Sequence, residues 1–182
     1  MKPFARFFAI LCLALPLLAC AALSRVSTAT PLATALNANT STLSDDPSTT
    51  LPVTDAYNPS SDPAADLQKA VSLAQKENKR ILIEVGGEWC VWCHIMDRFY
   101  DAHPALLKLR EDNYVLLKVN YSDENQNQAF LSQYPAIPGF PHIFVLESDG
   151  KLLHSQDTSE LEDGQSYHLE RFTTFLTHWA KP

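Results

Sequence analysis

The sequence RILIEVGGEWCVWCH occupies residues 80–94 and contains two different patterns. Its first seven residues are β-rich and apolar nearly throughout, which is typical of a strand that is covered on both faces. A pair of glycines interrupts this run, and a helical pattern follows over residues 89–100. Cys90 and Cys93 therefore lie where a buried strand gives way to a helix.

This position favours redox chemistry of the two cysteines. A thiol at the first turn of a helix faces unpaired backbone N–H groups and the positive end of the helix dipole, and both stabilise a thiolate. We therefore expect Cys90 to be the nucleophile. Cys93 lies one turn deeper on the same side, so it can attack the resulting mixed disulfide and close a Cys90–Cys93 disulfide.

Metal and haem binding are the alternatives for the same residues. One Cys-x-x-Cys pair provides two of the four ligands of a structural zinc site, and His94 and His103 are the candidate nitrogens. Cys90-x-x-Cys93-His94 also matches the attachment motif of c-type haem. The strand patterns that follow disfavour a helical haem domain, and Met96 is too close in sequence to reach the opposite haem face. We therefore predict no metal and no cofactor, with c-type haem as the alternative.

The residues on either side of this motif supply the other elements of an α/β domain. Strands separated by helices pair in parallel and a terminal hairpin is antiparallel, so we expect a mixed four-stranded central sheet flanked by helices. The expected helices are 63–78, 89–100, 104–110, 124–133 and 166–180, and the expected strands are 80–86, 114–120, 142–147 and 152–155.

With these elements in place, the chain resembles the thioredoxin superfamily over about residues 64–179. The segment 88–93, EWCVWC, is similar to the Trp-Cys-x-x-Cys active site of that family, and the segment 137–141, IPGFP, is similar to its cis-proline segment. Glu84 occupies the position of the family's buried carboxylate. The string Trp-Cys-Val-x-Cys resembles the C-terminal thioredoxin-like domain of DsbD, a transmembrane reductant carrier, and small exported thioredoxin-like proteins. The resemblance implies a thioredoxin fold.

The resemblance also implies roles around the sulfurs. Glu84, in an apolar strand, would have a raised pKa and exchange a proton with Cys93 through water, and the alternative is a carboxylate that reaches solvent. Pro141, if cis, would keep the backbone from crowding the sulfurs, and the alternative is an ordinary turn proline. Phe140 would then offer its backbone to an extended substrate strand.

Other residues near the motif have two interpretations each. Trp89 is expected beside the disulfide as a substrate contact surface, or in the core. Trp92 is expected to be exposed and to influence partner choice or redox poise, or to be an ordinary surface aromatic at the start of the helix. His94 and Asp97 are expected on the solvated helix surface, with thiolate stabilisation and a second acidic group as their alternatives. The acidic segment 155–165 is expected to be a solvated loop, with control of partner access as its alternative.

The N-terminal sequence predicts export. Residues 1–20, MKPFARFFAILCLALPLLAC, combine a basic start, an apolar run and small residues, which is typical of a signal peptide. Their end resembles a bacterial lipobox in which Cys20 becomes lipidated, and ordinary signal cleavage is the alternative. Residues 21–62, rich in Ser, Thr, Ala and Pro, predict a flexible tether before a thioredoxin-like domain over 63–182.

Composition excludes other classes of protein. The chain has 182 residues, of which 46% are hydrophobic and 19% charged, so wholesale disorder is excluded. A net charge of −7 without Lys or Arg clusters argues against nucleic acid as a partner. Four cysteines are too few for a scaffold held together by disulfides.

Together these observations predict an exported thiol–disulfide oxidoreductase, with reduction as the expected direction. Its expected partners are protein thiols and disulfides, with a membrane reductant carrier as a candidate, and the protein is expected to be a monomer. The expected location is the periplasm, on a lipid anchor, with a soluble periplasmic or secreted form as the alternative. The alternative function is a tethered thioredoxin-fold binding module whose cysteines are passive.

Overall fold

The structure of the chain is a computed structural model that describes residues 55–182. The predicted signal peptide, the lipidation site Cys20 and nearly all of the predicted tether lie outside these residues, so their assignments stay predictions. Within the described part of the chain, no helix is both long enough and apolar enough to cross a membrane.

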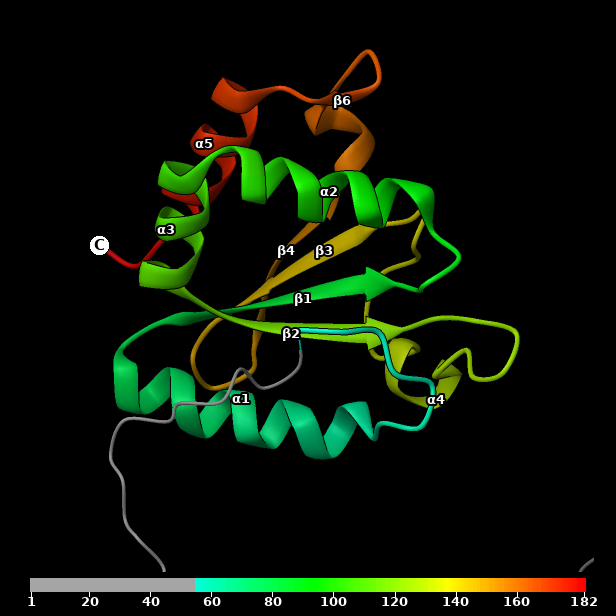
Figure 1. Cartoon of the computed structure of the whole chain (residues 1–182). Coiled ribbons are helices and arrows are strands. Elements are labelled where there is room, and N and C mark those ends of the chain that lie inside the picture. Colours follow the sequence, from blue (N-terminus) through cyan, green and yellow to red (C-terminus); the bar gives the residue numbers. More distant parts are fainter. Residues whose placement is uncertain (1–54) are drawn as a thin grey trace, which may run out of the picture. The chain divides into compact units, whose positions relative to one another are not determined.

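A four-stranded sheet with the strand order β2-β1-β3-β4 lies at the centre of the described residues (Figure 1). β1 (Arg80–Gly86) pairs in parallel with β2 (Tyr114–Asn120). β3 (His142–Leu146) is antiparallel to β1, and β4 (Leu152–Asp157) is antiparallel to β3. The predicted mixed four-stranded sheet is confirmed.

Helices cover both faces of this sheet, as predicted. α1 and α4 lie on one face, and α2, α3 and α5 lie on the other (Figure 1). β1 alternates accordingly: Ile81 and Ile83 join the buried apolar cluster under α1, whereas Leu82 joins the cluster under α2 and α5. The helices are α1 (Pro63–Glu77), α2 (Val91–Ala102), α3 (Pro104–Asn113), α4 (Gln128–Leu131) and α5 (Leu169–His178).

The first helix begins and ends on residues suited to those positions. The Asp62 side chain accepts hydrogen bonds from the backbone N–H groups of Ala64 and Ala65, and a proline occupies the first turn. The helix ends at Asn78, whose φ of 55° is left-handed, a conformation that asparagine tolerates better than most residues.

The helix expected over residues 124–133 is wrong for most of its length, because α4 covers only Gln128–Leu131. Polar side chains hold the preceding residues in a loop instead. The Asn120 side-chain amide donates to the Ser122 hydroxyl and to the carbonyl oxygen of Asn125, and Asn127 donates back to the carbonyl oxygen of Asn120. These side-chain bonds replace the backbone bonds that a helix would need.

The acidic segment 155–165 is not a simple solvated loop, and that expectation is corrected. β4 continues to residue 157, and a 3₁₀ helix η1 (Thr158–Leu161) and two short strands, β5 (Glu162–Asp163) and β6 (Ser166–Tyr167), follow. Their apolar groups are used in packing: the side chains of Thr158, Leu161 and Tyr167 are buried. Because β6 takes the residues before 168, the last helix starts later than expected.

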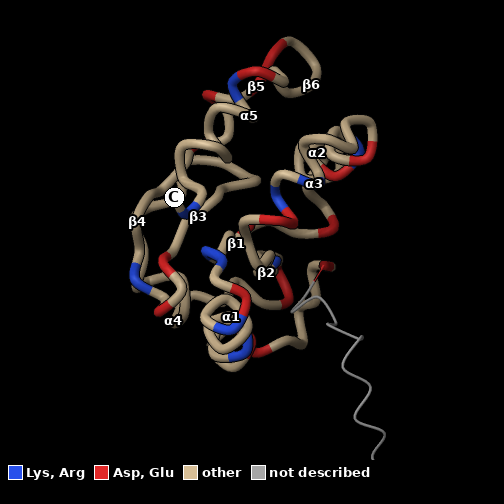
Figure 2. The backbone as a smooth tube through the Cα atoms, turned by 90° about the vertical axis from the view of Figure 1, so that its left-hand side faces the viewer, with Lys and Arg blue, Asp and Glu red and all other residues tan. Residues whose placement is uncertain are grey.

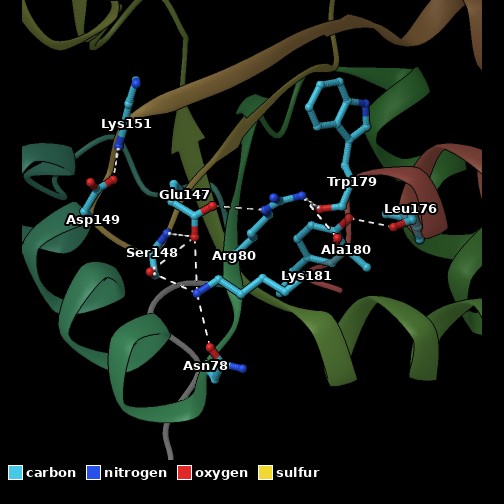
Figure 3. Close-up of polar contacts among 11 residues, drawn as sticks. Asn78, Arg80, Glu147, Ser148, Asp149, Lys151, Leu176, Trp179, Ala180 and Lys181 are labelled. Atoms are coloured by element: carbon cyan, nitrogen blue, oxygen red, sulfur yellow. Dashed lines mark hydrogen bonds and ion pairs between the residues drawn. The ribbon is translucent and has the colours of Figure 1, made fainter.

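Charged side chains close the sheet end where β1 begins (Figure 3). The Arg80 guanidinium donates to the carbonyl oxygens of Trp179 and Ala180 at 2.7 and 3.1 Å, and its Nε lies 3.4 Å from a Glu147 carboxylate oxygen. Lys181 Nζ lies 3.2 Å from the other Glu147 oxygen. This terminal clasp, made of Arg80, Glu147 and Lys181, ties the C-terminal residues to the start of β1. Elsewhere, Lys and Arg are dispersed over several elements (Figure 2).

Candidate active site

Cys90 and Cys93 form a disulfide at the start of α2, at the sheet end remote from the terminal clasp. Cys90 is the N-cap residue of α2, and its Sγ accepts a hydrogen bond from the backbone N–H of Cys93 at 3.1 Å. This is the donor that a thiolate at Cys90 would use. Both cysteines are almost fully buried, with exposed fractions of 2% and 0%.

The cis-proline segment reaches the disulfide through the topology of the sheet. Because β1 and β3 are antiparallel, the end of β1 and the start of β3 lie at the same edge, with Val85 paired to His142. The Phe140–Pro141 peptide bond that precedes β3 is cis. Phe140 packs against the cluster that contains both cysteines, and the Thr158 hydroxyl donates to the carbonyl oxygen of Pro141.

Glu84 lies inside the protein, on β1, with only 2% of its surface exposed. The Tyr57 hydroxyl donates a 2.5 Å hydrogen bond to Glu84 Oε1. Lys118, which pairs with Glu84 in the register of β1 and β2, places Nζ 3.9 Å from the same oxygen and 2.6 Å from Asp97 Oδ1. Burial raises the pKa of Glu84, and the Lys118 charge and the Tyr57 hydrogen bond oppose that increase.

Gly86 brings this acidic group and the disulfide together. A Cβ atom on Gly86 would lie 2.4 Å from Cys93 Sγ and 2.9 Å from the Tyr57 hydroxyl oxygen. Only a residue without a side chain therefore fits where β1 ends. Because Gly86 has no side chain, the Cys93 sulfur and the Tyr57 hydroxyl can occupy neighbouring positions.

The two tryptophans of the motif have different environments. Trp89 is 55% exposed, and its Nε1 donates to the carbonyl oxygen of Tyr121 at 2.6 Å. Its ring also meets the Phe140 ring edge-on, so it lies beside the disulfide cluster at the surface. Trp92 was expected to be exposed, and this is wrong: it is partly buried against the core and contacts the Tyr167 ring edge-on. β6 supplies that tyrosine, which sequence alone did not place.

A groove of about 760 Å³ opens next to Trp89. It lies between the Trp89 loop and the loop after β2, and carboxylates are numerous along it. Its lining residues are Pro59, Glu88, Trp89, Asn120, Tyr121, Ser122, Asp123 and Glu124.

The two expected surface residues of α2 have partners. His94 Nε2 lies 2.8 Å from the carbonyl oxygen of Glu88, so its ring turns back along the motif. Asp97 is 39% exposed and pairs with Lys118, which places it in the Glu84 network rather than on purely solvated surface. Within residues 55–182, no group of three or more His, Cys, Asp or Glu side chains lies close enough to share a metal ion.

Two residues of this site were missed by sequence reasoning. Lys118 is the one charged residue in the apolar strand 114–120. Because a buried lysine needs an acidic partner, the sequence did contain a sign that Lys118 belongs to a buried acidic site. Tyr57 is the single aromatic residue in the polar segment 24–63, a weaker signal of a buried anchor. Its contact with Glu84 joins residues 27 positions apart, which no periodicity reveals.

Comparison with known proteins agrees with this geometry. A family model described as thioredoxin-like matches residues 62–148. Residues 62–148 form a thioredoxin-like domain. The resemblance inferred from the Trp-Cys-x-x-Cys and cis-proline segments is thereby confirmed.

The chain is similar in sequence to thiol:disulfide interchange protein DsbD of two bacteria. It is 32% identical over 126 residues to the protein of Pseudomonas sp. (strain JR1 / K1) and 29% identical over 119 residues to that of Pseudomonas fluorescens. These matches cover 66% and 65% of this chain. The chain spans only about a fifth of the length of these relatives, since each match covers 20% of the longer protein.

Two solved structures share the fold of this chain over about two thirds of its length. The disulphide isomerase from Xylella fastidiosa Temecula1 matches with a TM-score of 0.58 and 20% identity, over 67% of this chain and 94% of that chain. The oxidised C-terminal domain of DsbD from Neisseria meningitidis matches with a TM-score of 0.51 and 17% identity, over 68% of this chain and 98% of that chain. The expected thioredoxin fold is confirmed.

Proposed function

We propose that this protein is a thiol–disulfide oxidoreductase that reduces disulfides of other proteins. The observation that carries the proposal is the Cys90–Cys93 disulfide at the N-terminus of α2, with buried Glu84 joined to the disulfide cluster through Tyr57. A passive structural disulfide gains little from such a short loop, and it has no need of a buried carboxylate. The similarity to thiol:disulfide interchange proteins supports the same chemistry.

The reaction would begin from the reduced dithiol. The Cys90 thiolate, stabilised by the Cys93 backbone N–H, attacks one sulfur of a partner disulfide. A bond forms between Cys90 and that sulfur, the partner's S–S bond breaks, and the partner's other sulfur leaves as a thiolate. The product is a mixed disulfide between Cys90 and the partner.

Cys93 would complete the reduction. Its thiol gives a proton to the Glu84 carboxylate, directly or through water, and the Cys93 sulfur then attacks Cys90 Sγ. The Cys90–Cys93 bond forms as the bond from Cys90 to the partner breaks, and the partner leaves with its second thiolate. Two electrons have moved to the partner, so a dithiol donor, such as a membrane reductant carrier, must restore Cys90 and Cys93 before the next cycle.

The residues around the sulfurs would receive an extended partner segment. Pro141 has no N–H to crowd the sulfurs, and the Phe140 backbone is available for hydrogen bonds to a strand. Trp89 offers an exposed aromatic surface on the other side of Phe140. Carboxylates along the adjoining groove would favour partner segments with a positive charge.

We also propose the location and organisation that the sequence predicts. Residues 1–20 would direct export, Cys20 would carry a lipid, and residues 21–62 would tether a monomeric domain in the periplasm. Globomycin inhibits lipoprotein signal cleavage, so treated cells should accumulate an uncleaved form. If the Cys20→Ala variant migrated on a denaturing gel at the same position as the processed wild-type protein, lipidation of Cys20 would be contradicted.

Insulin reduction tests the activity. The protein, reduced with dithiothreitol and then desalted, should precipitate insulin B chain when a dithiol donor is supplied. Cys90→Ser should abolish turnover, because the nucleophile is lost. Cys93→Ser should instead accumulate mixed disulfides, which the Cys90→Ser/Cys93→Ser control cannot form.

Two outcomes would contradict the proposal. One is a fully reduced wild-type protein with no more activity than Cys90→Ser. The other is a Soret band after expression with the cytochrome c maturation system, which would show that the cysteines carry haem.

A further inference from the structure

The segment before α1 carries a residue into the redox site from outside the region matched by the thioredoxin-like family model. Residues 55–61, here called the strap, run along β2 and then turn into α1 (Figure 1). The Asn125 side-chain amide donates to the carbonyl oxygen of Pro59 at 2.8 Å, and Ser61 N–H donates to the carbonyl oxygen of Asn58. The Asn125 bond holds the strap against the loop that follows β2, and the Ser61 bond closes a turn within the strap.

Tyr57 is the buried residue of the strap, with 5% of its surface exposed. It belongs to the same small cluster as Cys90 and Cys93, and its ring also lies under Lys118 Nζ, 4.9 Å from the ring centroid. Its hydroxyl donates to Glu84, and a Cβ on Gly86 would touch both that hydroxyl and Cys93 Sγ. The hydroxyl therefore bonds the carboxylate and lies in the neighbourhood of the resolving cysteine.

We propose that Tyr57 is a positioning residue of the redox site: it holds the Glu84 carboxylate ready to receive the proton of Cys93. This inference deepens the proposed oxidoreductase function and rests on it. The strap would then be a working part of the active site rather than the end of a tether.

The chemistry assigns one proton transfer to this arrangement. Cys93 gives its proton to Glu84 as it attacks Cys90, and Glu84 later releases that proton to solvent. The Tyr57 proton stays in place, because burial and the Glu84 charge raise the pKa of Tyr57 well above its ordinary value. Tyr57 thus acts only as a hydrogen-bond donor that favours the charged carboxylate over its protonated form.

Several charged or titratable groups face Glu84 besides Tyr57, and the test must separate them. Lys118 of β2 and Arg110 of α3 favour the carboxylate, whereas Asp97 of α2 disfavours it. The other residues that interact electrostatically with Glu84 are Tyr100 of α2 and Tyr167 of β6. Removing the Tyr57 hydroxyl leaves all of these groups in place and removes one bond that favours the charged form.

The experiment is the reaction of the reduced full-length protein with 5,5′-dithiobis-(2-nitrobenzoic acid), followed by stopped-flow absorbance. The first release of nitrothiobenzoate reports attack by Cys90, and the second reports resolution by Cys93. In Tyr57→Phe the second phase should be roughly threefold to tenfold slower at pH 7. Its pH midpoint should move upward, because Glu84 loses a bond that favours its carboxylate form, and the rate should recover at high pH.

Two comparison variants make the result specific. Tyr114→Phe removes another buried tyrosine hydroxyl, which donates to the carbonyl oxygen of Leu176, and it should leave both phases as in the wild type. Glu84→Gln should slow the second phase and remove its pH midpoint, and adding Tyr57→Phe to it should change nothing further. An unchanged midpoint in Tyr57→Phe, or a Tyr57→Phe effect that persists in Glu84→Gln, overturns the proposal.

The small disulfide reagent keeps this test separate from the proposed function. A protein that fails to reduce insulin still resolves the mixed disulfide with nitrothiobenzoate, so the two failures are distinguishable. If Tyr57→Phe does not fold, the wild-type protein labelled with [ζ-¹³C]tyrosine provides the answer by NMR. The chemical shift of the Tyr57 resonance should change with pH as Glu84 titrates. A chemical shift that does not change over this titration overturns the proposal.

Discussion

Gly86 shows how one missing side chain organises this active site. The Cβ of any other residue would lie 2.4 Å from Cys93 Sγ, a separation that real contacts do not reach. The neighbouring atoms belong to the disulfide and to buried Tyr57, and neither is the free end of a flexible side chain. The carboxylate, the tyrosine and the sulfur therefore depend on glycine at the end of β1.

Gly86→Ala is expected to destabilise the oxidised protein by about 1–3 kcal/mol, because the inserted methyl group overpacks a filled site. Urea unfolding of the oxidised protein measures this change. Gly139→Ala is the matched control: its added Cβ would meet no atom within 4 Å, so its unfolding free energy should stay close to that of the wild type. Equal effects of the two substitutions would contradict the crowding argument.

We expect Phe140 to limit access to the nucleophile. Cys90 is only 2% exposed, and Phe140 packs against its cluster while its ring stacks on Tyr121, with centroids 4.7 Å apart. Phe140→Ala removes this cover and keeps the backbone that would receive a partner strand. The Cys90 thiol of the reduced variant should therefore react with iodoacetamide several times faster than in the wild type.

The control for this experiment is Leu169→Ala, which removes a 45% exposed apolar side chain on α5 that is not part of the cluster around the cysteines. Its alkylation rate should match that of the wild type. An unchanged rate in Phe140→Ala would show that other atoms cover Cys90.

At the scale of elements, the start of β1 and the C-terminal residues are joined by the terminal clasp. Hydrogen bonding by the Ser148 backbone N–H, more than the nearby Lys181 and Arg80 charges, lowers the pKa of Glu147 to about 2. The ordinary value is 4.5, so the folded state favours the ionised form. The stability that results is fully present above the unfolded pKa and is lost as pH falls toward the folded value.

Glu147→Gln should therefore lower the free energy of unfolding at pH 7 by about 1 kcal/mol. The difference from the wild type should shrink as pH falls from about 5 toward 2 and below, because the wild-type carboxyl then becomes protonated as well. Urea titrations at several pH values in this window measure the difference. A difference for Glu147→Gln that is independent of pH would contradict the assignment.

For the whole molecule, the main elements could be predicted because local patterns dictate them. The runs 80–86 and 114–120 are apolar nearly throughout, and both are strands with the predicted bounds. The loop that replaces most of the helix expected over 124–133 could not be predicted in this way, because asparagine and serine side chains there bond to one another and to backbone groups brought near by folding. Periodicity does not record such bonds.

The candidate site also contains some features that local sequence predicts and others that only folding creates. The Cys-x-x-Cys spacing, the strand-to-helix junction and the cis-proline segment are local, so the sequence alone determined the thioredoxin-like domain and the redox pair. Lys118 opposite Glu84 and Tyr57 beside Cys93 depend on strand register and on the path of the strap. Only the tertiary structure decided these contacts. A buried charged group must be paired, and its partners are brought to it by folding from distant parts of the chain.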